Sequence, residues 1–488
     1  MTQGPREKSV NRPHLIDLAP VPDASSTNMV NHLPKPNADQ RAFQDLELGL
    51  FIHFGMNTFT GETTGGKGSH PPAMFNPTAL NCDNWMQVAQ AMGARFAVLT
   101  ARHEEGFCLW PTQTTDYCIR QSPYQGGRGD VVREFVTACR RHDIRPCLYH
   151  SSYMDARHIF QDGDPIQWHE EWFQSTKQRL AEPGAAERFT QMQVSQVREL
   201  LTQYGDITYL WLDHIGETQG ILDPAAVDSF WSAIVAEARA RQPHCLLLKA
   251  DIYLSRDRAA GGGVHGGRAA NPLWYACRRE NTREGQGDPI PDPAQGNQYI
   301  VWEANTIFSG SWFWNGPAVK PVAEMIEHYY ATVGRGATFL PNFAPDPRGL
   351  MTEQVLAHAQ AFGKRVRQLS ENPLGEMNGM GPALELELPG ETTVDHVVTM
   401  EDLREGQKIR AYSIEAREPG GAWTRIVTGQ SVGHKRIDRF APIRTDALRF
   451  SCLQSLAEPI GIRRFAAYCL STSGDPIQPL PAAPDSPV

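Results

Sequence analysis

The chain has 488 residues, which is too long for one ordinary hydrophobic core, so two domains are expected. A hydrophobic content of 41% and a charged content of 21% are typical of a globular protein that folds in water. The formal net charge of −9 argues against nucleic acid as a partner, because no basic face is available. No apolar stretch approaches the roughly 20 residues that cross a bilayer, so no membrane partner is expected.

The cysteines and the amino-terminal residues bear on the cellular compartment. The nine cysteines are scattered and form no CxxC pair. Several of them, such as Cys108, Cys139 and Cys147, lie inside apolar segments, which favours buried reduced thiols over disulfides or a zinc site. Residues 1–26 lack the apolar core of a signal peptide. We therefore expect a cytoplasmic protein, or a periplasmic or secreted one if a signal has been removed. Nothing in the sequence indicates the oligomeric state.

Strands and helices are expected to alternate over residues 41–372, after a proline-rich leader at 1–40. The expected strands are 48–54, 95–100, 145–150, 209–213 and 245–248, and the expected helices are 82–94, 130–142, 188–204, 225–241 and 351–370. This alternation predicts an α/β fold with a parallel sheet, and its length suits a (β/α)₈ barrel. The segment 251–298 interrupts the pattern. It contains a run of three glycines, which is not a phosphate loop because the lysine is missing. We expect a long irregular loop there, either functional or disordered.

The pattern changes after residue 372. Short or alternating strands are expected at 384–388, 395–400, 408–416, 423–428 and 448–452. They predict an all-β sandwich over residues 373–472, followed by a proline-rich tail at 473–488. This domain either supports the barrel or contacts the substrate.

Polar side chains close four of the expected barrel strands. Asp213 ends the apolar run 209–213, and the other strand ends carry His53, the segment 102–105 and His150. Catalytic groups of a barrel lie at the carboxyl ends of its strands, so these side chains should meet. Tryptophans 110, 302, 312 and 314 could add aromatic walls. Such a pocket suits a carbohydrate, and glycoside hydrolysis also needs two carboxyl groups.

Each of these candidates also has a structural alternative. Asp213 could cap a helix or pair with a buried cation, and His53 could be a core histidine. Glu104 and Glu105 could be a solvated pair, and the tryptophans could be packing residues. A metal site built from His103, Glu104 and His150 lacks the spacing of known metal motifs, so neither a metal nor a cofactor is expected.

Several ordered blocks resemble glycoside hydrolase family 29, the retaining α-L-fucosidases, and within it the plant-like α-1,3/1,4 branch. They include LGLFIHFGMNTFTGE at 48–62, RHEEGFCLWPTQTTDYCI at 102–119, YGDITYLWLDH at 204–214 and EANTIFSGSWFW at 303–314. The similarity runs from about residue 48 to 468. The resemblance implies that Asp213 is the nucleophile and that an oligosaccharide or glycoconjugate is the substrate. It also implies that the carboxyl-terminal sandwich is of the galactose-binding or discoidin kind. The substrate-binding candidates are His53, Glu62, His103, Glu104, Trp110, His150, Trp211, His214, Glu303 and Trp312.

The general acid/base of this branch is a glutamate in a WVGNE element, which the chain does not reproduce. Glu280 is the first choice, Glu284 the second and Glu303 the third. Two further departures adjoin the sugar. Glu104 stands where the family has the second histidine of KHHDGF, so an acceptor-only anion replaces an imidazole. His214 stands where a glycine usually follows the nucleophile.

The sequence therefore predicts a retaining exo-glycosidase that removes terminal α-L-fucosyl residues. Two alternatives stay open because of Glu104 and His214. One is a carbohydrate-binding homologue without activity, and the other is a glycosidase for a related sugar.

Overall fold

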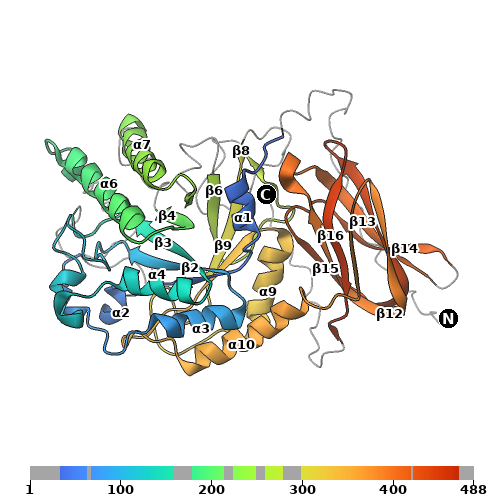
Figure 1. Cartoon of the computed structure of the whole chain (residues 1–488), viewed down its shortest axis with the longest axis horizontal. Coiled ribbons are helices and arrows are strands. Elements are labelled where there is room, and N and C mark those ends of the chain that lie inside the picture. The colour runs from blue at the N-terminus through green and yellow to red at the C-terminus, as the bar shows by residue number, and fades with distance from the viewer. Residues whose placement is uncertain are drawn as a thin grey trace, which may run out of the picture.

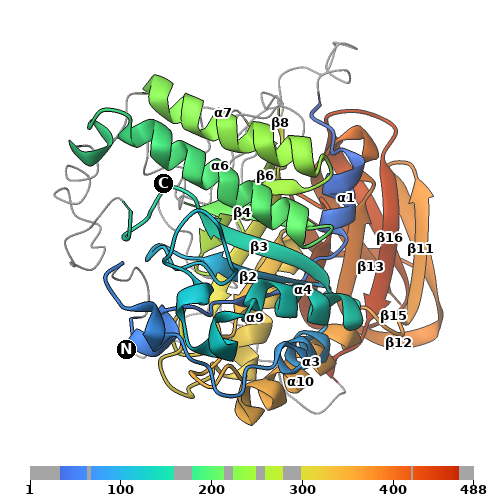
Figure 2. The same ribbon diagram turned by 60° about the vertical axis from the view of Figure 1, so that its left-hand side comes forward.

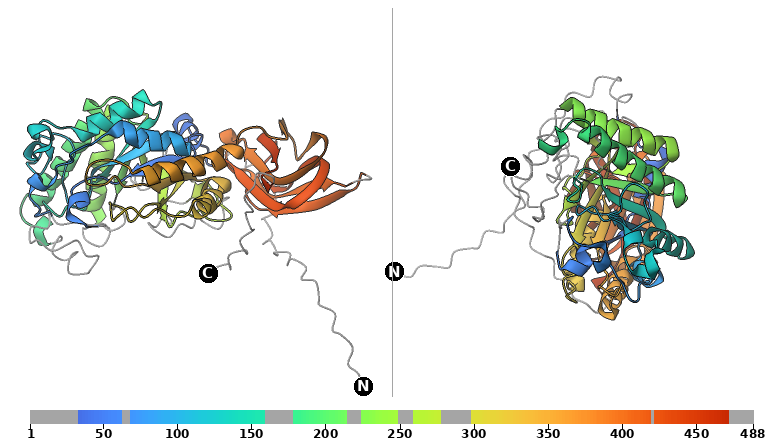
Figure 3. Two further views of the ribbon diagram at one scale, coloured as in Figure 1. Left: turned by 90° about the horizontal axis from the view of Figure 1, so that it is seen from below. Right: turned by 90° about the vertical axis from the view of Figure 1, so that its left-hand side faces the viewer.

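The structure, a computed structural model, describes residues 33–62, 68–158, 178–213, 224–248, 259–277, 298–418 and 421–471. The molecule is elongated and consists of two bodies (Figures 1 and 3). A barrel forms one end, and an antiparallel sheet forms the other. No helix among the residues just named is both long enough and apolar enough to pass through a membrane.

Eight parallel strands close the barrel in the order β1-β10-β9-β6-β5-β4-β3-β2. Their bounds are β1 Gly49–Ile52, β2 Phe96–Arg102, β3 Arg145–Ser151, β4 Tyr209–Asp213, β5 Leu246–Leu248, β6 Ala259–His265, β9 Val301–Ile307 and β10 Thr338–Asn342. The α/β barrel fold class predicted from the sequence is confirmed.

Helices precede and follow the barrel strands along the chain. Their bounds are α1 Ala38–Gln44, α2 Asn57–Thr60, α3 Cys82–Met92, α4 Val131–Arg141, α6 Ala185–Gln203, α7 Pro224–Arg241, α9 Val322–Thr332 and α10 Glu353–Gln368. The helices α6 and α7 lie side by side over β4, and α3 lies against α10 (Figure 2).

Local sequence sets the helix ends. The side chain of Asn81 accepts hydrogen bonds from the backbone N–H groups of Asp83 and Asn84, and α3 ends at Gly93, whose φ of 85° is left-handed. The Asp130 side chain caps α4 in the same way, and Thr352 caps α10. These caps satisfy N–H groups that have no partner inside the helix.

One prediction about the irregular segment is wrong. The three glycines at 261–263 lie inside β6, a strand of the closed barrel, and β7 (Ala276–Cys277) pairs with β8 (Gln298–Tyr299) further along. A strand is recognised in a sequence from the pattern of its side chains, which glycine lacks, and glycine is also rare in strands. For these reasons β6 could not be predicted from the sequence.

The antiparallel sheet has six strands in the order β11-β16-β12-β15-β13-β14. The bounds are β11 Gly375–Met380, β12 Ala383–Glu401, β13 Ile409–Arg417, β14 Trp423–Gly429, β15 Arg436–Ser455 and β16 Gly461–Tyr468. The pairing of the two long strands, β12 and β15, shifts register in two places, and the strands enclose an apolar core of their own. The hydroxyl of Tyr275 joins the two bodies, because it donates to the carbonyl of Gly336 and accepts from the backbone N–H of His434.

Alternation along the barrel strands decides which side chains face the interior. Phe51, Val98, Tyr149 and Trp211 belong to the cluster inside the barrel, whereas their neighbours in sequence pack in the layer between strands and helices. Cys108 and Cys139 are buried free thiols in that outer layer, and Cys147 is a buried free thiol inside the barrel. Asp213 follows Trp211 by two residues, so its side chain is directed to the interior at the carboxyl end of β4.

Candidate active site

Asp213 is held by Tyr149 on the neighbouring strand. The Tyr149 hydroxyl donates a hydrogen bond of 2.7 Å to Oδ2 of Asp213. Burial, with the charges of Asp213 and Glu104, raises the pKa of Tyr149 well above its usual range, so the hydroxyl stays protonated. Asp213 itself is partly exposed. The carboxylate is therefore fixed on one side by a hydrogen-bond donor and remains accessible.

Two histidines lie beside the ring of Tyr149. His103 stacks on the Tyr149 ring, with centroids 5.4 Å apart and 16° between the planes. His53 lies 5.5 Å from the ring of His103, and its Nδ1 is 2.8 Å from Oδ1 of Asn342. Both histidines are buried. Since Asn342 ends β10, the carboxyl ends of β1, β2, β3, β4 and β10 converge on one place, as expected for a barrel.

Aromatic rings surround this cluster. Trp211 stacks on Phe51 at 5.0 Å, inside the barrel. Trp312, in the loop after β9, is partly exposed, and its ring lies 5.0 Å from His53. A partly exposed indole beside a polar cluster offers a flat apolar face for a sugar ring. Trp211, by contrast, is 1% exposed and packs as part of the barrel interior.

Glu104 and Glu105 are buried rather than solvated. They are 3% and 1% exposed, so the alternative of a solvated surface pair is wrong. The charge of Glu104 acts on Tyr149, the residue that donates a hydrogen bond to Asp213. Glu62 lies further out, accepts a hydrogen bond of 2.9 Å from Thr60, and is 3.3 Å from His70.

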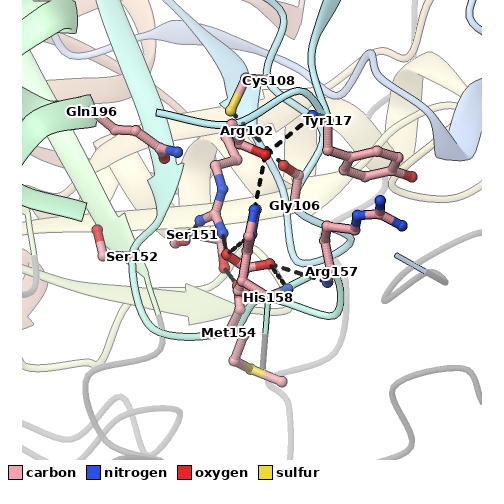
Figure 4. A network of polar contacts seen from close by, with 12 residues as sticks. Arg102, Gly106, Cys108, Tyr117, Ser151, Ser152, Met154, Arg157, His158 and Gln196 are labelled. Carbon is pink, nitrogen blue, oxygen red and sulfur yellow. Dashed lines mark hydrogen bonds and ion pairs between the residues drawn. The ribbon is translucent and has the colours of Figure 1, made fainter. Parts of the chain in front are cut away.

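A buried network ties the segment 102–105 to the loop after β3 (Figure 4). Arg102 forms a fully buried ion pair with Asp155 and donates to the carbonyl of Ser151. Asp155 Oδ2 is 2.7 Å from Nδ1 of His158, whose Nε2 is 2.9 Å from the Thr115 hydroxyl. Burial opposes ionisation of Asp155, but the Arg102 guanidinium and His158 outweigh it and hold its pKa well below the usual range.

Glu303 lies inside the barrel but away from the strand ends. It is fully buried and accepts a hydrogen bond of 3.0 Å from the hydroxyl of Tyr209. Tyr209 begins β4, whereas Asp213 ends it. This position matches a role in packing the barrel interior better than one beside the glycosidic bond.

The structure does not bring His150 and Trp110 to the cluster around Asp213. His150 alternates with Tyr149, so it faces outward, where its ring nitrogens lie 2.8 Å from Ser152 Oγ and 2.9 Å from Gln196 Oε1. Burial and the charge of Arg102 lower the pKa of His150 to about 3, so it is neutral. The indole N–H of Trp110 donates to Glu199 on α6 at 2.7 Å. Both were expected in the sugar pocket, and the direction of their side chains corrects that expectation.

Three predicted site residues lie outside the described part of the chain, namely Glu280, Glu284 and His214. Sequence reasoning also missed residues that the structure assembles, above all Tyr149 and Asn342. Their positions could have indicated them, because Tyr149 lies near the carboxyl end of a strand that was expected, and Asn342 ends β10. Both side chains face inward.

The chemistry that this site can support follows from its polar groups. Among the residues whose placement the structure gives, no group of three or more His, Cys, Asp or Glu side chains is arranged to hold a metal ion. The site offers a fixed, accessible carboxylate, two imidazoles and an exposed indole face. A closed barrel with these groups at its carboxyl-terminal mouth is the arrangement of a glycoside hydrolase.

Comparison with known proteins identifies the family. The sequence profile of the family described as Alpha-L-fucosidase matches residues 69–371. Alpha-L-fucosidase 1 of Arabidopsis thaliana is 29% identical over 450 residues, which cover 84% of this chain and 82% of that protein. The chain therefore belongs to the α-L-fucosidases, glycoside hydrolase family 29.

Solved structures agree with this assignment. A glycoside hydrolase 29 family member from an unknown rumen bacterium is 27% identical and has a TM-score of 0.73, covering 89% of this chain and 77% of that one. A Bacteroides thetaiotaomicron structure is 28% identical and has a TM-score of 0.76, covering 90% of this chain and 100% of that one.

Proposed function

We propose that the protein is a retaining exo-α-L-fucosidase that removes terminal α-1,3- or α-1,4-linked fucosyl residues from oligosaccharides, with Asp213 as the nucleophile. The observation that carries the proposal is the accessible Asp213 carboxylate at the end of β4, oriented by the Tyr149 hydroxyl. Membership of the α-L-fucosidase family and similarity to the Arabidopsis enzyme support the choice of sugar.

In the proposed reaction, Asp213 attacks the anomeric carbon and forms a glycosyl-enzyme, while a second carboxyl group protonates the departing oxygen. The same group then removes a proton from the water that hydrolyses the intermediate. Glu280 is the first candidate for this acid/base and Glu284 the second. Both lie in the segment 278–297, outside the described residues. Glu303 is the weakest candidate, because its carboxylate is engaged by Tyr209 inside the barrel.

The sugar would be bound by the groups around Asp213. His53 and His103 can exchange hydrogen bonds with hydroxyl groups, and the exposed face of Trp312 can cover an apolar face of the ring. The buried Glu104, whose charge acts on Tyr149, would add an acceptor to this pocket. This carboxylate favours a second candidate, a glycosidase for a related sugar whose hydroxyls suit an acceptor at that point. A panel of aryl glycosides would separate the two.

The direct test uses 4-nitrophenyl α-L-fucoside and natural α-1,3- and α-1,4-fucosylated oligosaccharides. Asp213→Asn should abolish release of fucose without unfolding the protein. Asp206→Asn is the matched control, because Asp206 is exposed and lies before β4 at the opposite end of the strand. Near wild-type turnover by Asp213→Asn would overturn the assignment of the nucleophile. Sugar binding without turnover of any substrate would leave a binding protein instead of an enzyme.

The acid/base has its own test. Azide can replace a missing general base in the second step, because it attacks the glycosyl-enzyme without needing deprotonation. Azide should therefore restore turnover of an activated aryl fucoside to Glu280→Ala. Rescue of Glu284→Ala alone would move the assignment to Glu284.

A further inference from the structure

A carboxyl group that the proposed reaction does not use is buried beside His103. Glu105 is 1% exposed, and its Oε2 lies 3.7 Å from Nδ1 of His103. Its Oε1 packs beneath Gly55, where an added Cβ would lie 3.6 Å from this oxygen. His103 in turn stacks on Tyr149, which holds Asp213. A series of contacts therefore runs from Glu105 through His103 and Tyr149 to the nucleophile.

We propose that Glu105 is a positioning residue for the sugar site, and that its proton determines which nitrogen of His103 donates a hydrogen bond into the pocket. This inference rests on the proposed glycosidase function and adds a residue to it. The stacking of His103 on Tyr149 restrains the plane of the imidazole ring. A neighbouring carboxyl group can then determine which of the two ring nitrogens carries the proton.

The surroundings of Glu105 decide its protonation. Burial raises its pKa to about 8; the hydrogen bond from its own backbone N–H and the charge of Arg102 oppose this rise, and the charges of Glu104 and Glu62 add to it. Burial, with the charge of Glu105 as a lesser cause, raises the pKa values of the nearby Tyr117 and Tyr149, so both hydroxyls stay protonated. At neutral pH the Glu105 carboxyl is therefore mainly protonated.

The two states of Glu105 have opposite effects on His103. When the contact between the two side chains shortens to hydrogen-bond distance, a protonated Glu105 donates to Nδ1, which leaves the proton of the neutral imidazole on Nε2, where it can be donated to a sugar hydroxyl. An ionised Glu105 accepts from Nδ1–H, and Nε2 of the neutral ring then becomes an acceptor. The contact of 3.7 Å is longer than a hydrogen bond. Such contacts in unliganded sites often tighten when a substrate binds.

The first test measures the tautomer directly. The protein is labelled with ¹⁵N-histidine, and the His103 signals are assigned by their loss in His103→Gln. Between pH 6 and 9 the wild-type signals should change from the Nε2–H to the Nδ1–H form, with a midpoint near 8. Glu105→Gln, whose amide N–H₂ can donate to Nδ1 at every pH, should hold the Nε2–H form throughout. An identical midpoint in Glu105→Gln would overturn the proposal.

The second test measures binding of L-fucose by calorimetry over the same range. Wild-type affinity should fall by roughly tenfold per pH unit above about 8 if the donor is essential, whereas that of Glu105→Gln should not. Glu134→Gln is the matched control, because Glu134 also has a raised pKa but bonds to Tyr124 in the outer layer. Its pH dependence should equal that of wild type. Equal pH dependence in wild type and Glu105→Gln would contradict the role of Glu105 in binding.

The two tests separate this inference from the function on which it rests. Absence of L-fucose binding at every pH would count against the proposed function, while the tautomer of His103 would still report on Glu105. If the protein binds L-fucose but the tautomer of His103 does not depend on Glu105, the proposed function is supported and the role of Glu105 is contradicted.

Discussion

Removing the Tyr149 hydroxyl should cost the enzyme much of its activity while leaving its packing intact. Tyr149→Phe deletes the 2.7 Å hydrogen bond to Asp213 but keeps the ring that stacks on His103 and lies 5.9 Å from Trp211. Hydrogen bonds to charged groups contribute about 1.5–3 kcal/mol. This range corresponds to a decrease of roughly 10- to 150-fold if the whole interaction is lost in the rate-limiting transition state.

The step most affected should be hydrolysis of the glycosyl-enzyme, because the Asp213 carboxylate is regenerated as the leaving group and Tyr149 stabilises its charge. Stopped-flow kinetics with an activated aryl fucoside should therefore show a burst of phenolate followed by slow turnover. Tyr153→Phe is the matched control, because this tyrosine is equally buried and its hydroxyl has no hydrogen-bond partner among the described residues. A Tyr149→Phe enzyme within twofold of wild type would refute the assigned role of the hydroxyl.

Three further predictions concern the walls and supports of the site. Trp312→Ala should raise KM by roughly 2- to 12-fold, because loss of a ring contact costs about 0.5–1.5 kcal/mol, and Trp312→Phe should restore part of the affinity; an unchanged KM would exclude a sugar contact. Asp155→Asn leaves Arg102 buried without its counter-charge, so the free energy of unfolding should fall by about 3–5 kcal/mol. Thermal unfolding measures this, and an unchanged Tm would contradict it. His150 is neutral in the fold but protonates in the unfolded chain below about pH 6.5. Its contribution to stability is thus present above pH 6.5 and lost as the pH falls toward 3, so the stability difference between wild type and His150→Gln, measured in urea, should shrink over that range.

The parts of the fold that sequence could predict are those in which side chains carry a clear pattern. The apolar run that ends in Asp213 forms β4, because every residue before the carboxylate packs on one side of the barrel wall or the other. The glycines of β6 carry no such pattern. The glycines are held in their strand by backbone pairing with β9, which is distant in sequence.

The site could be predicted in position but not in detail. A strand end marks the mouth of the barrel, and that was enough to place Asp213, His53 and His103 together. The direction of a side chain depends on the register of its strand, and a shift of one residue reverses it. This is why His150 was expected in the pocket, while Tyr149, its neighbour, is the residue that contacts Asp213.

Burial was the other property that the sequence did not show. Glu104 and Glu105 look like surface residues in a charged segment, yet both are enclosed by neighbouring strand ends and loops. The buried ion pair between Arg102 and Asp155 joins the loops on which they depend, and its partners are 53 positions apart in the sequence. Such pairings follow from the closed barrel rather than from any local motif.

A retaining mechanism requires Asp213 to form a covalent bond with the sugar. Incubation with 2-deoxy-2-fluoro-L-fucosyl fluoride, which slows hydrolysis of the intermediate, followed by proteolysis and tandem mass spectrometry, tests it most directly. We predict one fluorofucosyl group, attached to the carboxylate of Asp213. A label on another carboxyl group, or turnover that yields the inverted sugar without any label, would contradict the account.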